Sequence, residues 1–132
     1  MRAFPPALAL VLLSGLAIAQ DEPVPDYFVI AVFDVSTAQT LARSCATLSV
    51  DPVLAARQTE AVLAQLTEDG YTPENIQARM ADPSEAIGRL QRDFMDRHGL
   101  STGAAEEAVC AAGQKEIAEG TGVGALLLEV SE

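Results

Sequence analysis

Residues 26–47 read DYFVIAVFDVSTAQTLARSCAT, and this stretch decides the fold. Its first part, Tyr27–Val35, is almost continuously apolar, which by itself would suit a buried β-strand. A set of residues nevertheless recurs at alternating steps of four and three, a period that a strand cannot sustain. These residues are Tyr27, Ala31, Asp34, Ala38, Leu41, Cys45 and Leu48. We therefore expect one helix from about Asp26 to Thr47, with a strand over Tyr27–Val35 as the alternative.

This helix carries one of the only two cysteines of the chain, Cys45 and Cys110. An even number of cysteines in an exported chain predicts that they pair in an oxidising compartment. The alternatives are a reactive thiol pair or metal ligands, but neither cysteine lies in a C-x-x-C or zinc-type spacing. We expect a disulfide between Cys45 and Cys110.

The start of the chain has the pattern of a secretory signal peptide. Arg2 precedes an apolar run, Ala7–Leu13, and the small-x-small triplet Ala17-Ile18-Ala19 follows. The run is shorter than the roughly 20 residues of a membrane span, and no cysteine follows that could carry a lipid. We expect a signal peptide over 1–19, cleaved after Ala19, and a periplasmic protein without a stable membrane anchor. An uncleaved anchor is the alternative.

Composition limits the classes of partner. The chain has 132 residues and a net charge of −11, and removal of 1–19, with its single basic residue, makes the charge −12. Phosphate groups would be repelled by such a surface, so nucleic acid and anionic lipid are not expected as partners. After an extended leader over 20–25, the length of 26–132 suits one domain.

Helix starts and stops are marked along the rest of the chain. Three Pro residues each follow a residue that can accept a backbone hydrogen bond, the pattern of an N-cap followed by the first helical residue. The three pairs are Asp51-Pro52, Thr72-Pro73 and Asp82-Pro83. Gly70 and Gly99 suit helix ends. These signals predict helices near 52–69, 73–81, 83–98 and 103–119, and a short one within Val123–Val130. The fold class expected is all-α, a small single-domain bundle of about five to six helices with one disulfide.

Few residues point to chemistry. Asp34 interrupts the apolar stripe of the first helix, which suggests a partly buried acid with a raised pKa; the alternative is that the helix turns this position to solvent. His98, the only histidine, stands at a predicted helix end, where the helix dipole explains it. Gln65–Gly70 lacks the ligands of a calcium loop, and Gly120–Gly124 follows a helix instead of the strand that a dinucleotide loop requires. The sequence thus predicts no catalytic set, no cofactor and no metal site.

Three stretches together resemble an uncharacterised family of small exported alphaproteobacterial proteins, known only as a domain of unknown function. They are Asp69–Ile76 (DGYTPENI), Val109–Ile117 (VCAAGQKEI) and Gly122–Leu126 (GVGAL). Val109 and Gln114 depart from the family pattern. The resemblance implies a periplasmic helical fold and the disulfide, and it supplies no activity.

Three functions compete at this point. The first is a non-catalytic periplasmic binding or interaction protein, with a periplasmic protein as a possible partner, because no catalytic set is recognisable. The second is an acid-stress periplasmic chaperone, because protonation of 19 carboxylates would reverse the charge of the chain. The third is a small hydrolase or an enzyme inhibitor.

Overall fold

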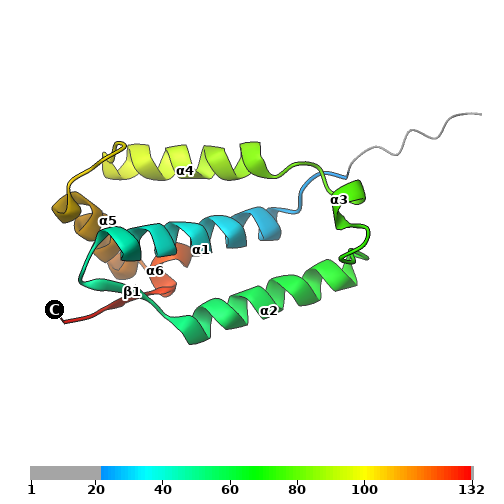
Figure 1. Cartoon of the computed structure of the whole chain (residues 1–132), viewed down its shortest axis with the longest axis horizontal. Coiled ribbons are helices and arrows are strands. Elements are labelled where there is room, and N and C mark those ends of the chain that lie inside the picture. The colour runs from blue at the N-terminus through cyan, green and yellow to red at the C-terminus, as the bar shows by residue number, and fades with distance from the viewer. Residues whose placement is uncertain (1–21, 132) are drawn as a thin grey trace, which may run out of the picture.

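The computed structural model describes residues 22–131, which form six helices and one two-stranded sheet (Figure 1). The elements are α1 (Asp26–Ser44), β1 (Leu48–Val50), α2 (Pro52–Glu68), α3 (Ile76–Arg79), α4 (Ser84–His98), α5 (Glu106–Glu119), α6 (Gly122–Ala125) and β2 (Leu127–Glu129). The predicted all-α class is confirmed. The predicted signal peptide, 1–19, lies outside the described residues.

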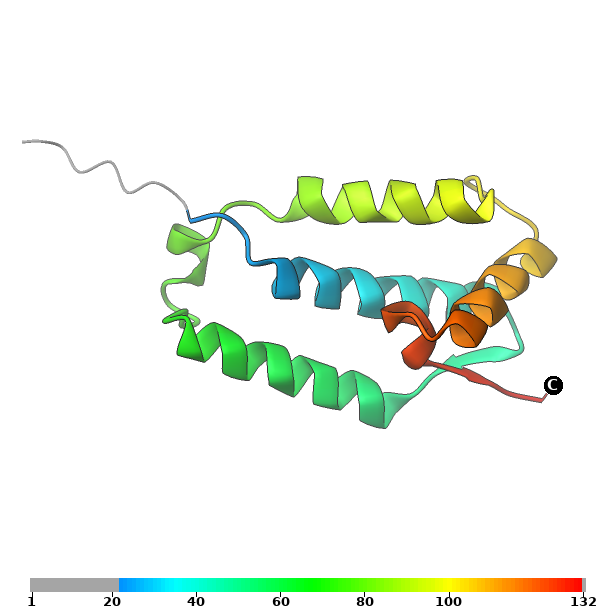
Figure 2. The same ribbon diagram turned by 180° about the vertical axis from the view of Figure 1, so that it is seen from behind.

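Helix α1 is the axis of the domain. It lies between α2 and α4, while α5 packs across it near its C-terminal end and α6 packs against its middle, at Asp34 (Figures 1 and 2). The helix prediction for 26–47 is therefore confirmed over most of its length, and the strand alternative is wrong. Because α1 is apolar on several faces, it buries residues toward more than one neighbour. The buried residues are Val29, Ala31, Asp34, Thr37, Ala38 and Leu41.

The C-terminal end of α1 differs from the prediction. The helix stops at Ser44, and Cys45 is already extended, with φ −139° and ψ 117°. The chain then enters β1, which pairs with β2 in antiparallel register, Ser49 opposite Leu128. The short helix predicted within Val123–Val130 is correspondingly wrong in its second half, where β2 lies. Strands of three residues are too short to show an alternating pattern, so the sequence did not reveal this pairing.

The predicted helix caps are largely present. Asp51 accepts hydrogen bonds from the backbone N–H groups of Val53 and Leu54, at 2.9 and 3.2 Å. Asp82 accepts one from the N–H of Ser84 at 2.9 Å. The helix predicted over 73–81 is shorter, since regular α3 begins only at Ile76. Its first turn is replaced by reciprocal bonds in which the side chains of Thr72 and Asn75 each accept from the other's backbone N–H.

A polar corner ties the start of the described chain to the connection between α2 and α4. The Glu22 carboxylate accepts hydrogen bonds from Arg79 at 2.8 Å and from the Tyr71 hydroxyl at 2.9 Å. The Tyr27 hydroxyl donates to Asp69 at 2.7 Å. Gly70, with φ +85°, allows the turn between them. The residues of the stretch Asp69–Ile76 therefore have a structural role, which is to hold the connection between α2 and α4 in place.

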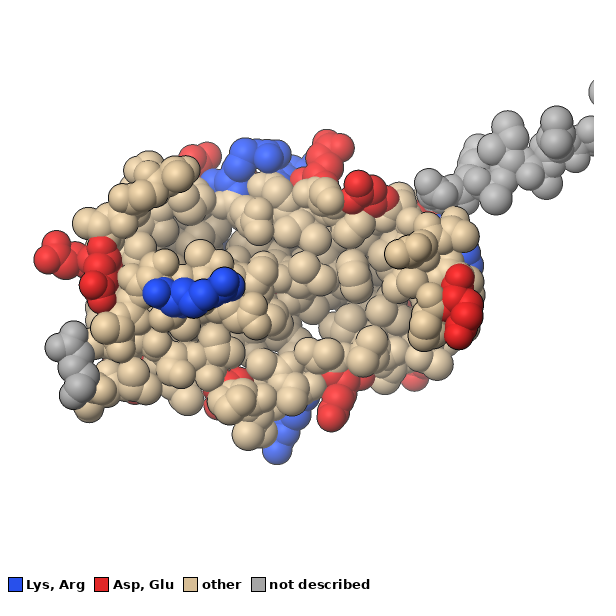
Figure 3. Space-filling view, viewed as in Figure 1, with Lys and Arg blue, Asp and Glu red and all other residues tan. Residues whose placement is uncertain are grey.

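The surface seen in Figure 3 is largely uncharged, with acidic side chains mainly near its edge. Within residues 22–131, no helix combines the length and the apolar character needed to cross a bilayer.

The predicted disulfide is present. Cys45 and Cys110 are joined, with Cα atoms 5.3 Å apart, and the bond links the end of α1 to α5. The two segments approach closely because Gly113 has no side chain: a Cβ there would overlap the Leu48 side chain. The two ends of the closed loop are 65 residues apart in sequence.

Replacement of both cysteines by alanine is expected to lower the free energy of unfolding by about 4 kcal/mol, the chain-entropy value for a loop of this length. Urea unfolding of the oxidised protein and of the double variant measures the difference. Wild-type protein treated with a reductant is the control and should match the variant. A loss below about 1 kcal/mol would show that the bond hardly constrains the unfolded chain.

Candidate functional site

The structure places Asp34 in the interior, between α1 and α6. Its exposed fraction is 7 %, and a Cβ on Gly122 would overlap its carboxylate. Burial raises the pKa of Asp34; a hydrogen bond from Gln58 opposes this rise and the charge of Glu116 adds to it. Asp34 is therefore a buried acid next to a second buried acid, which the sequence analysis did not identify.

The second acid is Glu116 on α5, the centre of what we term the Glu116 cluster: Glu116, Arg97, His98 and Thr121. The His98 Nε2 atom lies 2.6 Å from Glu116 Oε1, and an Arg97 guanidinium nitrogen lies 3.1 Å from the same oxygen. The Thr121 hydroxyl donates to the other carboxylate oxygen. The side chain of Glu116 is 1 % exposed and that of His98 is 4 % exposed. The cluster thus joins α4, α5 and the start of α6 through one buried carboxylate.

Opposing effects act on Glu116. Burial raises the pKa of its carboxyl group, but the hydrogen bonds from Thr121 and His98 and the charge of Arg97 together hold that pKa below its usual value of 4.5. From the sequence, the position of His98 at a helix end was explained by the helix dipole. The structure shows that His98 has a specific partner, Glu116. The two residues are 18 positions apart on different helices, so no local spacing could pair them. The one available signal was that Glu116 follows Gly113 by three positions and so shares the buried face of α5.

Glycines close this cluster from one side. A Cβ on Gly124 would overlap the backbone carbonyl of Glu116, and the backbone N–H of Gly124 donates to the Thr121 hydroxyl at 3.1 Å. Gly120 ends α5 with φ +65°, so Gly120–Gly124 forms a helix break with close backbone packing. These glycines let α6 pack directly on α5 and cover the buried carboxylate.

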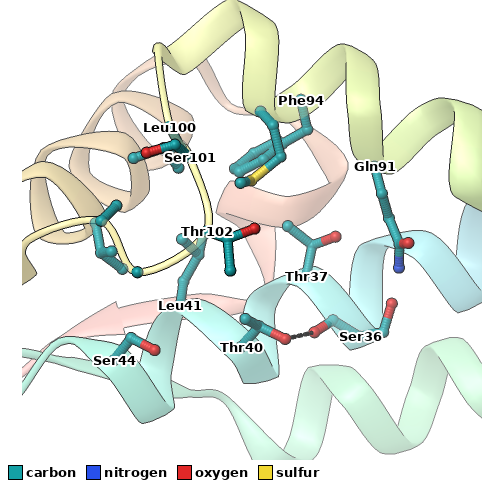
Figure 4. A pocket seen from close by; sticks show the side chains of 14 residues that line it. Ser36, Thr37, Thr40, Leu41, Ser44, Gln91, Phe94, Leu100, Ser101 and Thr102 are labelled. Atoms are coloured by element: carbon teal, nitrogen blue, oxygen red, sulfur yellow. Dashed lines mark hydrogen bonds between the residues drawn. The ribbon is translucent and has the colours of Figure 1, made fainter.

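The described chain also contains a cleft, which we term the α1–α4 cleft, of about 430 Å³ (Figure 4). It lies between α1, α4, the connection that follows α4, and the first turn of α5. Its lining residues are Ser36, Thr37, Thr40, Leu41, Ser44, Gln91, Phe94, Met95, Leu100, Ser101, Thr102, Gly103, Ala104 and Val109. None of them is charged. The volume falls in the range of small-molecule sites.

The hydroxyl groups in this cleft differ in their availability. Ser36 donates to the carbonyl of Phe33 at 3.2 Å, and Thr40 donates to the carbonyl of Ser36 at 2.8 Å. Thr37 is only 8 % exposed, and its hydroxyl makes no hydrogen bond to another residue of 22–131. Figure 4 shows Thr37 facing the cleft on the same side as Gln91. The cleft therefore offers a hydrogen-bonding group that the protein itself leaves unused.

The buried titratable side chains lie outside the cleft. Asp34, His98 and Glu116 do not line it, although the His98 ring lies against Phe94, with ring centroids 4.5 Å apart. The cluster thus lies behind the wall of the cleft and supports it. Within residues 22–131, no acidic or basic side chain lines the cleft, so none is placed to activate its serine and threonine hydroxyls as nucleophiles.

One group of residues has the composition of a metal site. The ligand atoms of Cys45, Glu106 and Cys110 lie within 4.8 Å of one another. Both sulfur atoms are in the disulfide, however, and a thiolate is the form of cysteine that binds a metal. The Glu106 carboxylate instead accepts a hydrogen bond from the backbone N–H of Ala46 at 2.9 Å.

Comparison with known proteins identifies the family of the chain. The family model described as a family of unknown function (DUF5333) matches residues 23–128, a range that contains the Glu116 cluster and the whole α1–α4 cleft. No curated protein and no solved structure matches the chain. The resemblance to an uncharacterised family is thereby confirmed.

The pKa of Glu116 predicts an acid-sensitive fold. Because this pKa is lowered on folding, the ionised carboxylate contributes stability above pH 4.5, its usual pKa, and that contribution is lost as the pH falls through the folded-state value. At pH 7, Glu116→Gln should be less stable than the wild type by about 3 kcal/mol. The difference should shrink toward pH 3, as measured by urea midpoints.

Glu119→Gln is the matched control, because Glu119 pairs with Lys115 at the surface at 4.0 Å. The Glu119→Gln variant should lose stability between pH 7 and pH 3 to the same extent as the wild type. A difference between Glu116→Gln and wild type that stays constant from pH 7 to pH 3 would contradict the assignment.

Proposed function

Since this chain belongs to DUF5333, a family of unknown function, we propose its role from its own geometry: it is a non-catalytic binding protein whose site is the α1–α4 cleft. The proposal includes export to the periplasm after removal of the predicted signal peptide, 1–19. The Cys45–Cys110 bond supports this location, because disulfides persist in oxidising compartments.

One observation carries the proposal: the cleft combines a volume of about 430 Å³, an apolar floor and a lining without any charged side chain, in which the Thr37 hydroxyl is open to a ligand. Phe94, Leu41 and Val109 form much of the floor and are 4 %, 3 % and 8 % exposed. An apolar pocket with a few polar groups that fix orientation is the usual form of a small-molecule site. The cleft is thus suited to hold a ligand.

The absence of catalysis is supported by where the titratable groups lie. The buried acids of the described chain, Asp34 and Glu116, are covered by α6 and engaged with Gln58, His98 and Thr121. A general acid or base has to reach the reacting group directly or through one water. These side chains support the cleft wall from behind and do not extend into the cleft.

A cleft-filling variant tests the proposal. Thr40 is exposed and lines the cleft, so Thr40→Phe should occupy part of the volume at little cost in stability. Thr67→Phe, on the exposed face of α2 and outside the cleft, is the control. In a ligand-observed NMR screen of a small-molecule library, we expect saturable binders to the wild type and to Thr67→Phe that are lost in Thr40→Phe. The absence of saturable binders, or equal binding to Thr40→Phe, would refute the proposal.

A second candidate, an acid-stress chaperone, is favoured by the Glu116 cluster. Acid removes the charge of the carboxylate that joins α4 to α5, and with full protonation the net charge of the mature chain changes from −12 to about +8. A groove of about 310 Å³ between α1 and α2 has an apolar lining that a fold loosened by acid would expose further. That lining includes Phe28, Val32, Val35, Val62 and Leu63.

For this candidate, the expected result is suppression of client aggregation at pH 3 but not at pH 7, together with increased binding of an apolar dye at pH 3. Glu116→Gln should shift both responses, because it removes the titrating group. Identical dye binding and client protection at the two pH values would eliminate the chaperone function.

A further inference from the structure

We infer that the α1–α4 cleft takes an uncharged amphipathic molecule of about a dozen non-hydrogen atoms, with its hydrogen-bonding group at Thr37 and Gln91 and its apolar body toward Leu41 and Leu100. This inference rests on the proposed binding function and adds the chemical class of the ligand.

Charge complementarity excludes ionic ligands. None of the lining residues is an acid or a base, so a charged ligand would lose its hydration without gaining an ion pair. The net charge of −11 further opposes the approach of anions. A cation would gain from that charge at a distance, yet it would meet no carboxylate in the cleft. A neutral molecule loses no ionic hydration on entering the cleft and is not repelled by the net charge of the chain.

The polar end of the site is set by Thr37. This residue is 8 % exposed and lines the cleft, and its hydroxyl donates to no other side chain or carbonyl of residues 22–131, so that hydroxyl is open to the cleft. A bound carbonyl or hydroxyl would replace water at this group and gain one hydrogen bond. In Figure 4 the side chain of Gln91 reaches from α4 toward α1 at the same end, above Ser36. An amide can both donate and accept, so this end can hold a carbonyl, an amide or a hydroxyl group.

The leucine side chains of the cleft lie on the other side of Phe94. Figure 4 shows Leu41 and Leu100 there, with the hydroxyl side chains of Ser44 and Ser101 beside them, and all four residues line the cleft. The Phe94 ring is held in place from behind by His98. A volume of about 430 Å³ equals roughly fourteen water molecules at about 30 Å³ each. A ligand with an aliphatic or aromatic body of moderate size therefore fits.

Three probes that share one body test the class: phenylbutanamide, phenylbutyrate and phenylbutylamine. At pH 7 the first is neutral, the second is an anion and the third is a cation. Isothermal titration calorimetry on the disulfide-bonded protein should show that the amide binds at least about tenfold more tightly than either ion, a factor that one unpaired charge readily supplies.

The variant Thr37→Val identifies the polar anchor. It should weaken the amide by about fivefold, the effect of one hydrogen bond, with the urea midpoint unchanged because this hydroxyl has no partner in the protein. Thr37→Ser keeps the hydroxyl and should restore binding. Thr67→Val is the matched control, since its hydroxyl bonds the Leu63 carbonyl on α2, away from the cleft.

The outcomes separate the two levels of the proposal. If an ion binds as tightly as the amide and Thr40→Phe blocks it, the ligand class is wrong and the binding function stands. If no probe and no library compound binds to the wild type with a binding that Thr40→Phe abolishes, the proposed binding function itself is wrong. An amide affinity that Thr37→Val leaves unchanged overturns the assignment of the anchor.

Discussion

The constraint on which the structure depends is that α1 has to be covered on several sides. Its apolar and small residues face α2, α4, α5 and α6; α2 and α4 pack mainly on α1, while α5 and α6 pack on α1 and also on one another. Ala31 and Ala38 allow these neighbours to approach. A single helix cannot be covered uniformly by helices that flank and cross it, so hollows are left along its length. The α1–α4 cleft is one of these hollows.

Two linkages fix the helices around the axis. The disulfide attaches the end of α1 to α5, and the Glu116 carboxylate attaches α5 to the end of α4 and to Thr121. Because the His98 ring lies against the Phe94 ring, one turn away on α4, the same carboxylate also holds one wall of the cleft. A buried charge is tolerated here because both of its oxygens are hydrogen-bonded.

Local signals in the sequence predicted the features that depend on neighbouring residues. The helix period of α1, the caps at Asp51 and Asp82, the glycine helix ends and the burial of Asp34 are of this kind. The pairing of β1 with β2 and the contact of His98 with Glu116 join distant segments, and no spacing encodes them. The cleft was also missed, because Ser36, Thr37 and Gln91 look like ordinary surface residues until α1 and α4 are placed side by side.

The central claim is that the hollow between α1 and α4 is a binding site. Backbone amide chemical shifts recorded during titration with phenylbutanamide test it most directly, since they locate the contact residue by residue. We predict saturating shifts confined to residues 36–44 and 91–104 together with Val109. Shifts concentrated on α2, or a spectrum that does not change, would contradict the account.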